Sequence, residues 1–158
     1  MNSTAAVPKF TAALELLDRA IELYLRRDSY YSALNLAGAA EEVLAVYARE
    51  LPADPGSGVG SASDQLKKLF VAMATLEERE AAEKWFHDRT YNAKNSVKHK
   101  RGKGDNFVDF DPKEEAGELL ELAVSTYFQL FSRTNIPYLP SVEAFDRERR
   151  LESATDAA

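Results

Sequence analysis

The chain has 158 residues, a typical length for one domain with a sizeable hydrophobic core. Hydrophobic residues make up 45% of it and charged residues 29%, a balance typical of soluble globular proteins. The net charge of −6 excludes a general nucleic-acid coat protein, so contact with nucleic acid requires a local basic patch. The absence of cysteine excludes disulfides and thiolate metal sites. With no signal-peptide pattern and no apolar run near about 20 residues, the sequence predicts a cytoplasmic protein without a membrane segment.

The first half of the chain predicts two amphipathic helices. Residues 1–8 are expected to form a flexible N-terminus, and the helix that follows has apolar residues at three- and four-residue spacing: Phe10, Leu14, Leu17, Ile21 and Tyr24. A second helix, capped by Asp28 or Ser29, runs to about Leu51. It contains the small-residue run Ala37-Gly38-Ala39-Ala40, which indicates close approach of a neighbouring helix or subunit, with a ligand role as the alternative.

A breaker-rich loop and two further helices come next. The loop, residues 52–63, is rich in glycine, but no Lys-Ser or Lys-Thr pair follows its last glycine, which excludes a P-loop. Ser61 or Ser63 caps a short third helix. The apolar side of that helix, predicted to face inward, carries Leu66, Leu69, Phe70 and Met73. A capping box at 75–78 starts a fourth helix, which runs to about His99.

The last part of the chain predicts a fifth long helix and a tail. A loop at 100–110 leads to Asp111, which caps a helix with a proline in its first turn. The inward residues of this helix are Ala116, Leu119, Leu120, Ala123, Tyr127, Leu130 and Phe131. Residues 135–158 are expected to form a C-terminal extension with an apolar, extended start at 136–140, a short charged helix at 141–150 and a disordered end.

These elements predict an all-α fold: an antiparallel bundle of four long helices plus one short helix, occupying residues 9–134. On a helical wheel, the core side of the fourth helix carries Phe86, Ala93 and Val97, with Ala82 beside them. A polar stripe next to it either borders a cleft or forms ordinary exposed surface: Asp88, Asn92, Asn95, Ser96 and His99. The third side is predicted to face solvent and carries His87, Tyr91, Lys94 and Lys98.

Metal and nucleophile chemistry find no support in the residue patterns. Ferritin-like sites need Glu-x-x-His pairs, whereas Glu83 and His87 are four apart and Glu41 and Glu42 have no such histidine. The chain also lacks cysteine and a Gly-x-Ser-x-Gly nucleophile elbow. We therefore expect no metal and no cofactor.

The segment Ala93-Lys94-Asn95-Ser96-Val97-Lys98-His99 resembles the signature of the HEPN superfamily, and residues 29–44 resemble that family's second helix. The likeness covers most of residues 9–133. It implies a HEPN-like helical bundle, a homodimer and, as in many active members, metal-independent ribonuclease activity. The family motif has an arginine, often followed by an asparagine, and then a histidine.

The resemblance makes Lys94, Asn95 and His99 the candidate catalytic residues, at the positions of the family's arginine, asparagine and histidine. A histidine can act as general acid or base in RNA cleavage, while a cation and an amide hold the phosphate. Lysine offers a point charge where arginine offers a planar fork. On a continuous helix the side chains of Lys94 and His99 point about 140° apart. In the family, a similar angular separation of the two side chains is overcome partly because the sites lie near a dimer interface, where both protomers contribute residues.

The candidate substrate-binding residues surround this motif and are Asn92, Arg89, Lys98, Lys100 and Arg101. The last three, with Lys103, form a local basic patch where an RNA strand is electrostatically favoured. The alternative is that His99 and its neighbouring cations only stabilise the C-terminus of the helix. In the same alternative, Asn92 and Asn95 are solvated or bonded between helices.

Two functional hypotheses remain open. In the first, the protein binds RNA or cleaves it without a metal, in defence or as the toxin of a toxin–antitoxin pair, with an antitoxin as protein partner; that setting comes from the resemblance. In the second, it is a catalytically silent, dimerising HEPN-like module that binds a nucleotide or a protein partner. Lys94 in place of arginine favours the second, whereas Asn95, His99 and the basic patch favour the first.

Overall fold

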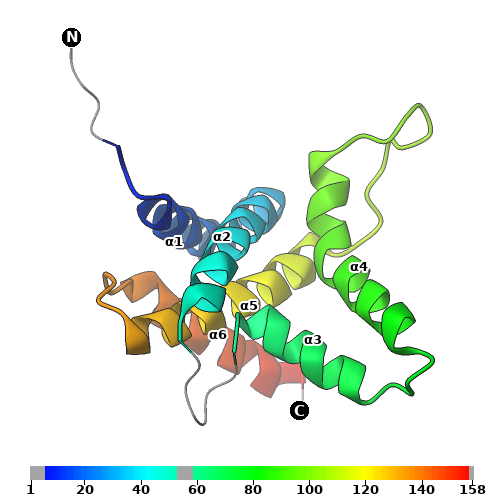
Figure 1. Cartoon of the computed structure of the whole chain (residues 1–158). Helices are drawn as coiled ribbons and strands as arrows, with labels where there is room; N and C mark the ends of the chain where they lie inside the picture. Colours follow the sequence, from blue (N-terminus) through cyan, green and yellow to red (C-terminus); the bar gives the residue numbers. More distant parts are fainter. Residues whose placement is uncertain (1–5, 53–58, 157–158) are drawn as a thin grey trace.

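The computed structural model describes residues 6–52 and 59–156, and within these ranges it contains helices and no strand (Figure 1). The helices are α1 (Lys9–Arg26), α2 (Tyr30–Glu50), α3 (Ala62–Ala72), α4 (Arg79–Lys98), α5 (Pro112–Arg133) and α6 (Pro140–Asp156). The predicted all-α fold is confirmed. Parts of three predicted segments lie outside the described residues, namely 1–5, 53–58 and 157–158.

Side-chain caps start two of the helices as the sequence predicts. At α3, the Ser61 hydroxyl accepts a hydrogen bond from the Asp64 backbone N–H at 3.2 Å. The Asp64 carboxylate accepts one in return from the Ser61 backbone N–H at 3.0 Å, which completes a capping box. At α5, the Asp111 carboxylate accepts hydrogen bonds from two backbone N–H groups of the first turn, and Pro112 occupies that turn.

The fourth helix starts later than predicted. The Glu78 carboxylate accepts hydrogen bonds from the Thr75 backbone N–H at 3.3 Å and from the Thr75 hydroxyl at 2.7 Å. The Glu78 backbone N–H also donates to the Thr75 carbonyl oxygen at 3.1 Å, so the two residues close a separate turn. The prediction that a capping box at 75–78 starts the helix is therefore wrong, and α4 begins at Arg79.

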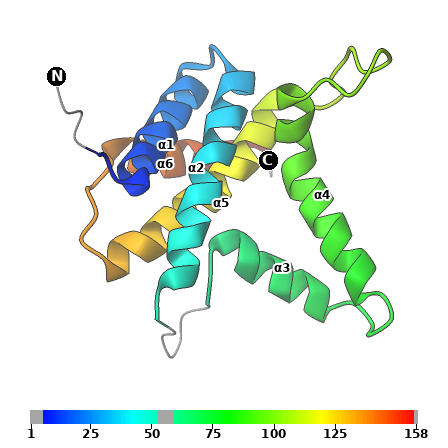
Figure 2. The ribbon, with the colours of Figure 1, turned by 45° about the horizontal axis from the view of Figure 1, so that its top comes forward.

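α2 packs most extensively, against α1 and α5, and forms the centre of the core (Figures 1 and 2). Its buried residues are mostly small: Ala33, Leu34, Ala37, Gly38, Ala40, Glu41, Leu44, Ala45 and Ala48. A Cβ atom at Gly38 would collide with the side chain of Lys94 on α4 and lie 3.3 Å from Cδ2 of Leu119 on α5. The predicted close approach of neighbouring helices to the small-residue run is thus confirmed.

α6 is longer than the predicted helix at 141–150 and runs from Pro140 to Asp156. Val142 and Phe145 are fully buried, and the Phe145 ring meets the Tyr24 ring of α1 edge-on at 5.4 Å. The segment before α6 lies on the core as predicted, because the Tyr127 hydroxyl donates to the Pro137 carbonyl oxygen and accepts from the Leu139 N–H, each at 3.0 Å. These long-range contacts explain why a charged sequence is helical over this length.

α3 and α4 project together from the side of the other four helices (Figure 2). The apolar side of α3 was predicted to face inward, but Leu66 is half exposed, Leu69 is 67% exposed and Met73 is 80% exposed. That part of the prediction is wrong, because α3 contacts the rest of the molecule through only part of its apolar side. Phe131 on α5, also predicted inward, is 40% exposed.

Candidate functional site

α4 and the residues that immediately follow it position every side chain of the predicted site. The helix ends at Lys98, and His99 is its C-cap, whose extended backbone (φ −128°, ψ 125°) still donates a hydrogen bond from its N–H to the Asn95 carbonyl oxygen at 3.0 Å. The chain then runs through residues 100–111 without regular secondary structure. His99, Lys100 and Arg101 are all exposed at this junction.

Lys94 does not face solvent, which corrects the prediction from the helical wheel. Its residue exposure is 7%, and its side chain lies over Gly38 of α2 and forms an ion pair with Glu42. The ammonium also lies 4.8 Å from the centre of the Tyr91 ring, within cation–π range. A long side chain can lay its alkyl stem over apolar surface while its charged end finds a partner, and the missing side chain at Gly38 provides the space.

A buried carboxylate lies beside Lys94, and sequence reasoning assigned it no role. Glu41 on α2 is 1% exposed, and its Oε2 accepts a hydrogen bond from the Tyr91 hydroxyl at 3.2 Å. The Tyr91 hydroxyl also lies 2.9 Å from the hydroxyl of Ser63 on α3. Within the part of the chain that the structure describes, Oε1 of Glu41 has no hydrogen-bond partner.

Burial governs the ionisation of this group. It raises the pKa of Glu41 above its ordinary value, while the Tyr91 hydrogen bond and the charges of Lys94 and Arg49 oppose the rise. Burial, followed by the nearby Glu41 charge, raises the pKa of Tyr91 to about 12. The signal in the sequence was a pair of glutamates, Glu41 and Glu42, within a stretch of α2, residues 36–46, that is otherwise made of small and apolar residues.

A cavity of about 250 Å³ adjoins this cluster and contains two of the three predicted catalytic residues. Its lining residues are Glu41, Glu42, Ala45, Arg49, His87, Tyr91, Lys94 and Asn95. Arg49 forms an ion pair with Asp64 at 2.7 Å, and Lys94 forms one with Glu42. Both cations are therefore compensated, and His99 does not line this cavity.

His99 instead lines a depression of about 410 Å³ between the end of α4 and the loop that follows. Its lining residues are Tyr31, Ser96, Val97, His99, Lys100, Asp105, Asn106, Phe107 and Val108. The Phe107 ring is 88% exposed. Among the described residues, none of the four cations of this junction forms an ion pair: Lys98, Lys100, Arg101 and Lys103.

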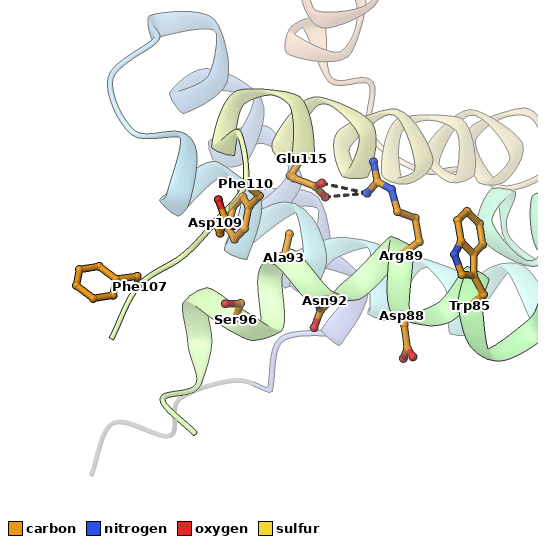
Figure 3. A pocket seen from close by; sticks show the side chains of 10 residues that line it. All are labelled: Trp85, Asp88, Arg89, Asn92, Ala93, Ser96, Phe107, Asp109, Phe110 and Glu115. Carbon is orange, nitrogen blue, oxygen red and sulfur yellow. Dashed lines mark hydrogen bonds and ion pairs between the residues drawn. The ribbon is translucent and has the colours of Figure 1, made fainter. Parts of the chain in front are cut away.

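A second depression, of about 550 Å³, adjoins the first and shares Ser96 and Phe107 with it (Figure 3). Its lining residues are Trp85, Asp88, Arg89, Asn92, Ala93, Ser96, Phe107, Asp109, Phe110 and Glu115. The Arg89 guanidinium is held by Glu115 at 3.0 Å and by Glu118 at 3.1 Å. We call the two depressions together the α4 groove. Four of the five residues of the predicted polar stripe border it, all except Asn95.

The predicted site residues therefore separate into two places. The α4 groove contains His99 and Lys100 at one end and Arg89 and Asn92 at the other, with Lys98 and Arg101 exposed near His99. Lys94 and Asn95 line the cavity against α2. The cations that flank His99 in sequence are those of the basic patch, and they can attract an anion.

Among the described residues, no group of three or more His, Cys, Asp or Glu side chains is placed to hold a metal ion. None of the described helices is long and apolar enough to cross a membrane. Comparison with family models, with curated proteins and with solved structures found no match. The resemblance to the HEPN superfamily therefore rests on the motif at 93–99 and on the segment at 29–44.

Proposed function

We propose that the protein is a HEPN-like helical module that binds RNA at the His99 end of the α4 groove. The observation that carries this proposal is the set of four cations that flank His99 in sequence, none of which forms an ion pair among the described residues, together with the exposed Phe107. Asp105 is the one carboxylate that lines this end of the groove. Cations attract phosphates, and an exposed aromatic ring offers a stacking surface for an unpaired base. The proposal includes the HEPN-like antiparallel arrangement, a homodimer and a cytoplasmic location.

The far end of the groove contributes differently. Arg89 is compensated by Glu115 and Glu118, and Asp88 and Asp109 add negative charge. Phosphates are disfavoured there, so the strand is expected to follow the basic patch, with Asn92 and Ser96 available to a base or ribose.

Cleavage is not part of the proposal, because the ion pair with Glu42 compensates Lys94 and Lys94 lines a different cavity from His99. Within one chain, a phosphate next to His99 would therefore lack the cation at the position of the family's arginine. This favours the catalytically silent form of a HEPN-like module over a ribonuclease. It also means that Lys94→Arg, held by the same glutamate, is not expected to produce a nuclease.

The binding test is fluorescence anisotropy with a labelled single-stranded RNA. Lys100→Glu combined with Arg101→Glu should weaken binding about tenfold or more, whereas Lys67→Glu combined with Lys68→Glu on α3 changes the net charge equally and should not. If the four cations each neutralise one phosphate, raising the salt from about 50 to about 200 mM should weaken wild-type binding about 50-fold. Equal weakening by both double variants would show that only the overall charge matters and would overturn the proposed site.

The cleavage test uses the same RNA with EDTA present. We expect no cleavage by the wild-type protein. His99→Ala is run beside His87→Ala, because these are the two histidines of the chain and both are exposed. Cleavage that His99→Ala abolishes and His87→Ala retains would establish a metal-independent ribonuclease and contradict the silent form.

A further inference from the structure

α3 carries an apolar stripe that the described chain does not cover. Leu66, Leu69, Phe70 and Met73 have the i, i+3, i+4, i+7 spacing of a helix side that packs against another helix. Leu69 and Met73, at the outer part of the stripe, are largely exposed. Exposed apolar surface that is contiguous, rather than scattered, typically marks an interaction site.

The stripe continues into an apolar cleft between α3, α4 and α5, with a volume of about 430 Å³. Its apolar lining residues are Leu66, Phe70, Trp85, Phe86, Leu119 and Leu122. The Phe70 and Trp85 rings are stacked, with centroids 5.0 Å apart and an interplanar angle of 19°. A wall built from stacked aromatic rings on two different helices is a preformed surface for an apolar side chain.

The rim of this cleft is acidic. Three glutamates of α5 line it: Glu115, Glu118 and Glu121. Arg89 pairs with Glu115 and Glu118. Arg149 of α6 pairs with Glu121 at 2.6 Å, so two cations face three carboxylates and the rim keeps a net negative charge. Burial raises the pKa of Glu118, and the neighbouring glutamates raise it further, while Arg89 opposes the rise. Like charges therefore repel one another along the rim, and an additional cation there would be stabilised.

We propose that the cleft between α3, α4 and α5 binds a basic amphipathic helix of a protein partner. The apolar side chains of that helix enter the cleft and cover Leu69 and Met73, and its Lys or Arg side chains contact the glutamate rim. Nucleic acid is disfavoured by the negative rim. A second copy of the chain packed cleft to cleft would bring two acidic rims together, which electrostatic repulsion opposes.

The probe is a fluorescein-labelled synthetic peptide of about 18 residues, long enough to form a helix on binding. It has leucine at i, i+3, i+4 and i+7 and lysine at the other positions. A scrambled peptide of the same composition and a peptide with glutamate in place of lysine serve as comparisons. With the full chain, we expect both comparison peptides to bind at least about tenfold more weakly in anisotropy titrations.

Leu69→Gln combined with Met73→Gln should weaken binding of the leucine–lysine peptide about tenfold, and Glu118→Gln about threefold. Both leucine and methionine positions are exposed, so folding should be retained, which circular dichroism checks. Leu151→Gln is the control for the apolar change, since Leu151 is exposed on α6. Glu22→Gln is the control for the charge change, since Glu22 is exposed on α1 and paired with Arg19.

Equal binding of the scrambled peptide, or unchanged binding by the Leu69 and Met73 double variant, would reduce the effect to general charge attraction and overturn the proposal. Sedimentation supplies a second test. If the wild-type chain is a dimer that this double variant converts to monomers, a second copy covers the stripe instead. The cleft shares Trp85, Arg89 and Glu115 with the far end of the α4 groove but no lining residue with its His99 end, where RNA is proposed to bind, so failure of either proposal is visible independently of the other.

Discussion

Glu41→Gln is expected to stabilise the protein at neutral pH. The carboxylate is 1% exposed, its Oε1 lacks a partner among the described residues, and burial raises its pKa above the ordinary value of 4.5. An acid whose pKa is raised by folding contributes stability that is present below the unfolded pKa and is lost as the pH rises through the folded pKa. Each pKa unit of that rise corresponds to about 1.4 kcal/mol of lost unfolding free energy.

The glutamine amide has nearly the shape of the protonated acid and can keep the hydrogen bond to Tyr91. The free energy of unfolding of the variant should therefore match that of the wild type near about pH 4 and exceed it by about 1–2 kcal/mol at about pH 7. The corresponding rise in Tm is about 2–8 °C. Urea unfolding followed by circular dichroism across this pH range measures the difference.

Glu42→Gln is the matched control, because it removes the same charge from the adjacent, exposed residue. It deprives the buried Lys94 of its partner, so it should destabilise rather than stabilise at neutral pH. Between about pH 5 and about pH 8, the unfolding free energy of the wild type should fall relative to that of Glu41→Gln. If it does not fall, the reasoning is refuted, because Glu41 would then hold its proton no more tightly in the folded state than in the unfolded state.

Three further substitutions test the packing. Lys94→Met keeps the alkyl stem but removes an ion pair with the exposed Glu42, so the free energy of unfolding measured with urea should change by less than about 1 kcal/mol. RNA binding should not change, and loss of binding would make Lys94 part of the site. Phe145→Ala should cost about 3–5 kcal/mol, and a cost below about 1 kcal/mol would contradict a core role for α6. Tyr127→Phe removes both hydrogen bonds to the segment before α6 and should lower the free energy of unfolding by about 1–2 kcal/mol, measured by thermal unfolding. An unchanged Tm would show that apolar contacts alone hold that segment.

Local chemistry made much of the secondary structure predictable. Ser61 and Asp111 cap helices because their side chains reach backbone N–H groups within one turn. The apolar spacing of α1 and α5 likewise identified the sides that became buried, because these helices pack along most of their length. The polar stripe of α4 borders a groove, one of the two outcomes that the sequence allowed.

The position of α6 could not be read from its sequence. Its charged residues indicated a short helix at 141–150, and the segment has few apolar positions. Its additional length is stabilised by contacts with residues more than one hundred positions away, such as the Tyr24 hydroxyl donating to Glu152 at 3.1 Å. Periodicity within one segment carries no information about such partners.

By itself, the sequence determined that this protein is all-α, where most of its helices lie and which side chains cap α3 and α5, because those properties depend mainly on neighbours within a few residues. Only the tertiary structure decided that Lys94 is buried against Glu42, that Glu41 is enclosed beside Tyr91 and that the apolar stripe of α3 stays exposed. The physical reason is that an apolar stripe or a charged side chain indicates only which kind of partner surface would stabilise the helix. Whether another helix supplies that partner depends on how the helices are arranged in space.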